Sequence, residues 1–301
     1  MAGQPSATEV APDLRGGSGS VLGPVPDTLR QIGILSRYQL RDYMRSLRFA
    51  ILYGLVVAVA AILTIVIAYY RPAALLTNPS ALYGTAWGGG IAFVIVLTAV
   101  FFGGDAIAGE FQNKTGYFLM GQPIRRATVY TGKFLAAFAA ALGGILLFAL
   151  LLVANGVYYF GTGAFPLALG ESFGLAVIYL LAVLGTTFLF SSLFKTSAYG
   201  TLLTAILFLF GFTILQELVS VLVKIEPWFI ISYASAVIGD IFLSPYPAHV
   251  VTTHVSRGIG RGVLSVTTYT PTIAEGVAIM LAYFVVTAVV GLLLFEREEF
   301  A

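Results

Sequence analysis

The stretch FAILYGLVVAVAAILTIVIAYY, residues 49–70, contains no charged side chain and is followed directly by Arg71 and Pro72. A helix needs roughly 20 apolar residues to cross the hydrocarbon core of a bilayer. Because that core offers no water to the backbone, a crossing segment must satisfy its own peptide groups as a helix. The stretch therefore predicts a transmembrane helix that ends near residue 70.

The composition of the whole chain is that of a membrane protein. Of its 301 residues 58% are hydrophobic and 10% are charged, with a mean hydropathy of +0.93, whereas soluble domains carry about 25% charged residues. Five more apolar runs are long enough to cross a bilayer, at residues 84–104, 134–157, 172–194, 199–223 and 273–295. We therefore predict an all-α integral membrane protein with six transmembrane helices.

The remaining segments predict how the chain is organised. Residues 1–27 are rich in Gly, Pro and Ser and lack an apolar run, which predicts a disordered tail. Residues 28–299 are expected to form one transmembrane domain with a loop at 105–133 and a long segment at 224–272. The chain has no cysteine, which excludes a disulfide framework, a thiolate metal site and a thiol nucleophile.

The placement of Lys and Arg predicts the orientation. One side of the predicted bundle holds only Arg71, Lys224, Arg257 and Arg261, and the other holds the remaining 12 of the 16 basic residues. Cytoplasmic loops carry the excess of positive charge in membrane proteins. Both termini and the 105–133 loop are therefore expected in the cytoplasm, and the 224–272 segment outside.

An amphipathic elbow helix is predicted at residues 28–47, with Asp27 at its N-cap. Its arginines recur at helical spacing, as Arg37, Arg41, Arg45 and Arg48. Such a helix is expected to lie in the inner membrane interface with its cations toward anionic lipid head groups. The alternative is a topological anchor with no further role.

The long outward segment contains one apolar piece, WFIISYASAVIGDIFL, at residues 228–243. This piece is too short to span comfortably, which predicts an interfacial or re-entrant helix. His249 and His254 follow it, but zinc sites need at least three protein ligands, and Asp240 is the only acidic candidate nearby in the sequence. Two solvated loop histidines and no metal site are predicted.

Glu217 is the deepest acidic residue in any predicted span. A carboxylate at mid-membrane costs about 2.5–3.5 kcal/mol on insertion scales, but Lys224 lies two turns away on the same face. An interfacial position is favoured, and a role in lining a transport pathway is the alternative. The other spans hold almost no ionisable groups, which argues against coupling to protons or sodium.

The predicted cytoplasmic loop raises two questions about chemistry. TGKF, residues 131–134, resembles the end of a phosphate-binding loop. However, Phe134 stands where the motif requires Ser or Thr, and Ala127 stands where it requires its first Gly. No nucleotide site, catalytic residue or metal is therefore expected in this chain. The apolar side chains Tyr117, Phe118, Leu119 and Met120 lie between charges, which predicts either a docking surface for another protein or packing against the protein's own helices.

The stretch IAGEFQNKTGYFLMGQPIRRATVYTGKFLAA, residues 107–137, resembles the signature loop of permease subunits of type-2 ABC exporters. The residues that carry the resemblance are Glu110, Thr115, Gly116, Leu119, Pro123, Ile124, Arg125, Arg126, Gly132 and Lys133. The elbow helix, the six spans, the short KTSAYG turn at 195–200 and the long segment before the last span also fit that family.

The resemblance implies a mechanism. Two permease subunits, identical or different, would form the pathway, and separate ATPase subunits would supply ATP and magnesium, with no cofactor in this chain. Residues 110–121 would be a coupling helix seated on the ATPase, and Glu110 would pair with the basic elbow face or with an arginine of the ATPase. ATP-driven closure would tilt spans one, two and five.

The family further implies the plasma membrane of a prokaryote, lipid contacts and no nucleic-acid partner, and the uncharged spans suit an apolar or amphiphilic cargo. A membrane-embedded lipid-modifying enzyme and a scaffold that recruits a cytoplasmic protein remain the alternatives. The first would need clustered catalytic polar groups at the interface, and the second would use the loop without transport.

Overall fold

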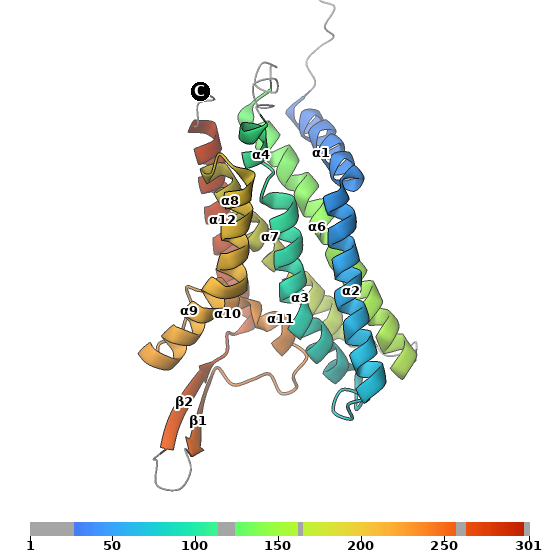
Figure 1. Cartoon of the computed structure of the whole chain (residues 1–301). Coiled ribbons are helices and arrows are strands. Elements are labelled where there is room, and N and C mark those ends of the chain that lie inside the picture. The colour runs from blue at the N-terminus through green and yellow to red at the C-terminus, as the bar shows by residue number, and fades with distance from the viewer. Residues whose placement is uncertain (1–26, 114–123, 162–164, 257–262, 298–301) are drawn as a thin grey trace, which may run out of the picture.

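The computed structural model of the chain describes residues 27–113, 124–161, 165–256 and 263–297. Its described part contains six helices long and apolar enough to cross a membrane, which confirms the predicted all-α membrane fold (Figure 1). They are α2 (Leu47–Tyr70), α3 (Pro79–Gly103), α6 (Arg126–Phe160), α7 (Leu167–Leu193), the fifth span over Ser197–Val223, and α12 (Ile273–Arg297).

Helices α3 and α7 form the centre of the bundle. In α3 and α7, 72% and 61% of the apolar window is buried, against 22% in α2 and 6% in the fifth span. Helix α7 packs on α3 and α12, and α3 packs on α6. Since buried apolar surface needs no lipid, α3 and α7 hold the monomer together, while α2 and the fifth span turn most of their apolar surface outward.

The third span begins earlier than predicted. Helix α6 starts at Arg126, because Thr128, Tyr130 and Lys133 are buried against other parts of the protein and extend the helix beyond the apolar run. Residues 126–133 therefore belong to this helix and not to the 105–133 loop. The described start of that loop forms α4 (Ala108–Gln112).

The fifth span is irregular. It consists of α8 (Ser197–Ile206), the π-helical η1 (Leu207–Gly211), α9 (Phe212–Leu218) and the π-helical η2 (Val219–Val223), and it ends where Lys224 adopts a left-handed conformation with φ 56°. Figure 1 shows α9 diverging from the bundle. π-Helical turns inside a span commonly mark functional sites.

The apolar piece at residues 228–243, which the structure describes throughout, forms no single interfacial helix. It contains two short helices, α10 (Ile231–Ser235) and α11 (Val237–Asp240), and α11 packs on α3 and α7. A Cβ on Gly88 would lie 2.6 Å from the Cα of Gly239, so these two glycines permit α11 to touch α3. Trp87 Nε1 also donates to Ser172 Oγ at 2.8 Å, and Ser172 Oγ donates to the carbonyl of Ile238.

An antiparallel hairpin follows, which the sequence analysis missed. Strands β1 (Val250–Ser256) and β2 (Val263–Tyr269) pair with Val250 opposite Tyr269 and Ser256 opposite Val263. The hairpin projects from the end of the bundle opposite α1 (Thr28–Arg45) and the end of α12 (Figure 1). The described start and end of the chain thus lie at one end, as an even number of spans requires.

Candidate coupling site

Helix α1 is fixed on the end of the bundle by close contact with α6. A Cβ on Gly132 would lie 2.9 Å from Leu35 Cβ, so glycine is required for the two helices to approach this closely. Tyr43 is buried, and its hydroxyl donates to the carbonyl of Phe102 at 2.8 Å. Burial raises the pKa of Tyr43 well above its usual range, so the hydroxyl remains a donor across physiological pH.

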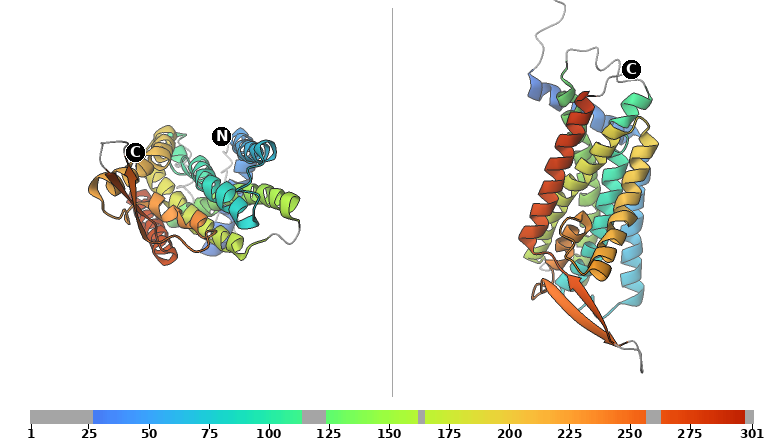
Figure 2. Two further views of the ribbon diagram at one scale, coloured as in Figure 1. Left: turned by 90° about the horizontal axis from the view of Figure 1, so that it is seen from below. Right: turned by 90° about the vertical axis from the view of Figure 1, so that its left-hand side faces the viewer.

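The chain turns sharply at Ser46 between α1 and the first span. Ser46 Oγ accepts from the backbone N–H of Phe49 at 3.2 Å and donates to the carbonyl of Tyr43 at 2.7 Å, which caps α2. As a result α1 crosses the end of the bundle obliquely (Figure 2). Arg48 lies beyond this turn, in the first turn of α2, and forms an ion pair with Asp105.

The other three elbow arginines, Arg37, Arg41 and Arg45, are exposed along α1. Ile34, Tyr38 and Met44 on the same helix are exposed too. Helix α1 therefore offers cations and apolar side chains together outside the bundle.

Helix α4 is held by the end of α7 and the start of α8. Ser191 Oγ of α7 accepts from the backbone N–H groups of Ile107 and Ala108, both at 3.0 Å. Gln112 Oε1 accepts from the N–H and the hydroxyl of Ser197 at 3.0 and 2.8 Å, and Ser197 is the first residue of α8. Both ends of this short helix are thus bonded to spans.

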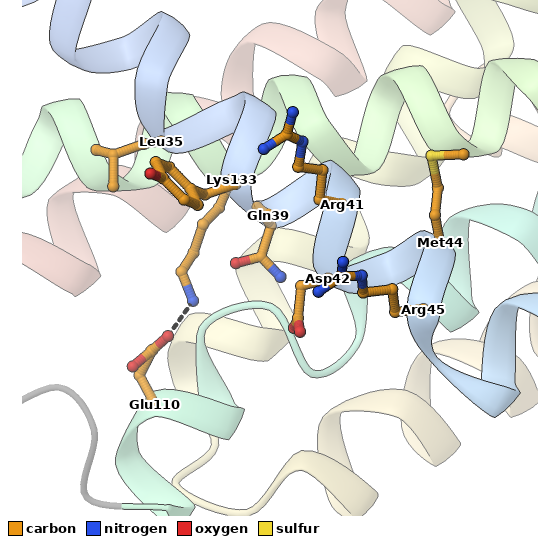
Figure 3. A pocket seen from close by; sticks show the side chains of 9 residues that line it. Leu35, Gln39, Arg41, Asp42, Met44, Arg45, Glu110 and Lys133 are labelled. Carbon is orange, nitrogen blue, oxygen red and sulfur yellow. Dashed lines mark hydrogen bonds and ion pairs between the residues drawn. The ribbon is translucent and has the colours of Figure 1, made fainter.

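Glu110 forms an ion pair with Lys133 of α6, a partner that the sequence analysis did not consider for it (Figure 3). Lys133 is buried, and its Nζ also donates to the carbonyl of Ala106 at 2.7 Å. Removing a buried lysine from water is costly unless it is paired and hydrogen-bonded. The pair therefore holds α4 against α6, beside a pocket of about 930 Å³ between α1, α4 and α6.

The sixth span is joined to the same region. Arg126, at the start of α6, donates from Nη1 to the carbonyl of Glu296 at 2.9 Å, near the end of α12. The ring of Phe111 lies edge-on to that of Phe295, with centroids 6.5 Å apart. Together with the Arg48–Asp105 ion pair, these contacts link the α3–α4 segment and the start of α6 to every span.

Several predicted site residues lie outside the described residues, namely Thr115, Gly116, Tyr117, Phe118, Leu119, Met120 and Pro123. Arg125 is exposed at the N-cap of α6. Lys133 carries part of the family resemblance but was given no role in the predicted site, and Ser191 and Gln112 were not singled out. A lysine directly before the apolar run at 134–157 was a usable signal for Lys133, whereas nothing near Ser191 or Gln112 in the sequence marks them.

Glu217 is exposed on α9. Within the described residues, the ion pairs are Arg48–Asp105, Lys133–Glu110 and His249–Glu226, so Glu217 and Lys224 do not form one there. The structure places Glu217 on the span that turns most of its surface outward, away from the contacts around α4.

Six apolar spans and an amphipathic helix across one end of the bundle define a multi-pass membrane protein. Comparison with known families matches residues 34–300 to the ABC-2 family transporter protein family. The chain belongs to this family, and it is a membrane component of a transporter. No curated protein sequence matches the chain.

Proposed function

We propose that this chain is the transmembrane subunit of an ATP-driven exporter that works as a dimer of such subunits. Separate ATPase subunits would bind at the end of the bundle that carries α4, in contact with α4 and the residues that follow it. ATP and magnesium would be held by that partner. The end of the bundle with α1 and α4 would face the cytoplasm of a prokaryotic cell.

The observation that carries the proposal is the set of contacts around α4. This five-residue helix contacts α6, α7 and α8 directly, so a displacement of α4 must also displace these helices. Packed elements with few alternative arrangements transmit such displacements over long distances. A force applied by an ATPase at the loop would therefore reach the spans that line a pathway.

The pathway is proposed on the side of the molecule formed by α2, α3 and α8. Helices α2 and α8 flank α3 on one side, with α6, α7 and α12 behind them in both views (Figures 1 and 2). In α2 and the fifth span only 22% and 6% of the apolar window is buried, and α12 is the one other span in this range, at 17%. A second subunit on this side would enclose an apolar cavity suited to an apolar or amphiphilic cargo.

The test is association with the ATPase. Changing Phe118 and Leu119 together to Glu places two charges in the proposed docking surface, so the tagged chain should no longer purify with a Walker A protein. Phe165→Glu is the matched control, since Phe165 is exposed at the opposite end of the bundle, just before α7. It should leave association intact.

Unchanged association of the Phe118 and Leu119 variant would mean that these side chains pack within the protein itself. Recovery of the unaltered chain alone, or with a partner that binds no nucleotide, would overturn the proposal. Either a membrane enzyme or a non-transporting scaffold would then explain the fold better.

A further inference from the structure

Three ligand-type side chains meet beside the base of the hairpin, although they are far apart in the sequence. Glu226 follows the fifth span, His249 immediately precedes β1, and Glu275 lies in the first turn of α12. One ligand atom from each lies within 4.8 Å of the other two. Because Asp240 is the only acidic residue close to His249 in the sequence, this group was not predicted.

The spacing of the His249 and Glu226 donor atoms fits a zinc ion. His249 Nε2 and Glu226 Oε2 lie 3.3 Å apart. Two donors that each lie about 2.0–2.1 Å from a tetrahedral zinc are separated by roughly 3.3–3.4 Å. One imidazole nitrogen and two carboxylate oxygens would leave a fourth position for water.

Each of the three side chains is oriented by a group outside the set. His249 Nδ1 donates to the carbonyl of Thr270 at 2.8 Å. In the neutral ring the proton is therefore on Nδ1, and Nε2 carries the lone pair that can bind a metal ion. Glu226 Oε1 accepts from the Tyr233 hydroxyl at 2.6 Å, and Oε2 of the same carboxylate points to His249. Such outer partners are a regular feature of histidine and carboxylate ligands.

Glu275 is fixed in a similar way. Its Oε2 accepts from the backbone N–H of Thr272 at 3.3 Å, and its own N–H donates to Thr272 Oγ1 at 3.3 Å. This reciprocal arrangement is a capping box at the start of α12. One carboxylate oxygen thus remains for a ligand.

We propose that Glu226, His249 and Glu275 bind a zinc ion that fastens the base of the hairpin to the start of the last span. The imidazole favours zinc over magnesium or calcium, which take oxygen ligands. The side chains of His249 and Glu226 are 42% and 26% exposed, so an ion can enter without unfolding. The inference does not depend on the proposed export function.

The full chain, purified without a histidine tag and stripped with a chelator, should be titrated with zinc chloride by calorimetry. We expect one zinc per chain and a rise in Tm on binding. His249→Ala should abolish both, whereas His254→Ala, which removes the neighbouring histidine of β1, should change neither. Tyr233→Phe should weaken zinc binding by about ten-fold or more, since it removes an outer partner of a ligand.

Glu226→Gln provides a second ligand variant of nearly unchanged shape, should His249→Ala fail to fold. Cobalt(II) in place of zinc should give the strong visible absorption of a tetrahedral site in the unaltered chain and lose it in Glu226→Gln. Substoichiometric zinc, or equal binding by the His249 and His254 variants, would overturn the proposal. Glu226 and His249 would then form only a carboxylate–imidazolium ion pair.

Discussion

The pair formed by Lys133 and Glu110 is the ion pair that holds α4 against α6. The side chains are only 9% and 18% exposed, so the loss of one partner leaves the other in a partly dry site. Removing one partner of a buried pair lowers the stability by about 3–5 kcal/mol. Replacing both partners by well-packed apolar residues is often neutral or stabilising.

A double-mutant cycle with Lys133→Met and Glu110→Gln tests this contact. Each single variant should lower the thermal stability of the purified chain, and the double variant should lose less than the sum. We expect a coupling energy of about 1–3 kcal/mol, measured from unfolding in detergent. Additive effects within about 0.5 kcal/mol would show that the two side chains act independently.

Gly132 offers a second test at the scale of one residue. Gly132→Ala brings a Cβ to 2.9 Å from Leu35 Cβ, while nothing lies within 4 Å of a Cβ at Gly54. Alanine is favoured over glycine in a helix by about 1 kcal/mol, and overpacking costs about 1–3 kcal/mol.

Gly54→Ala should therefore raise the Tm slightly, and Gly132→Ala should lower it and make α1 more accessible to protease. Equal effects of the two substitutions would indicate that α1 does not sit against α6.

At the scale of elements, the sequence predicted every span but not every boundary. Apolar runs identified the spans, because the bilayer core tolerates little else. The start of α6 could not be placed in this way, since Arg126 and Lys133 are stabilised by partners from α12 and α4 that are distant in the sequence.

The hairpin was missed although its signal is present. VVTTHVS and VLSVTTY are rich in β-branched residues and flank the glycine-containing RGIGRG, a pattern typical of two paired strands. The candidate site was predicted only in part. Glu110 was singled out, but its partner depends on which helices pack together, and no local pattern contains that information.

The proposed dimer face makes a prediction about which spans meet in the membrane. The natural chain has no cysteine, so a single introduced cysteine provides the only thiol of the chain that can be cross-linked. Leu202→Cys on α8 and Ile51→Cys on α2, both exposed in the monomer, should form dimers with a bifunctional thiol reagent in native membranes. Val286→Cys on α12 is exposed to a similar extent, at 60% against 58% for Leu202 and 55% for Ile51, and should not.

Cross-linking through Val286 but through neither Leu202 nor Ile51 would place the partner on the opposite side of the bundle. The pathway would then have to be assigned to the α7–α12 side.

At the scale of the whole molecule, the orientation of the bundle is open to a direct test. Asn113→Cys lies after α4, and Val251→Cys lies on the hairpin; both positions are exposed. In cells with an intact plasma membrane, an impermeant maleimide should label Val251→Cys only. Asn113→Cys should react after the membrane is opened, and the reverse pattern would contradict cytoplasmic termini.

For ATP-driven export, the chain must transmit a force from an ATPase to its own spans. This requirement separates binding of the ATPase, which the loop after α4 would provide, from transmission, which the contacts of α4 would provide. A variant that keeps the first and loses the second would distinguish the two.

The most direct measurement is ATP hydrolysis by the purified complex in lipid, for the unaltered chain and for Lys133→Met. We expect a stoichiometric Walker A partner in both complexes. ATP hydrolysis should change the yield of cross-links between α2 and α8 in the unaltered complex but not in the Lys133→Met complex. A chain that purifies without any nucleotide-hydrolysing protein, or a Lys133→Met complex that couples normally, would contradict these expectations.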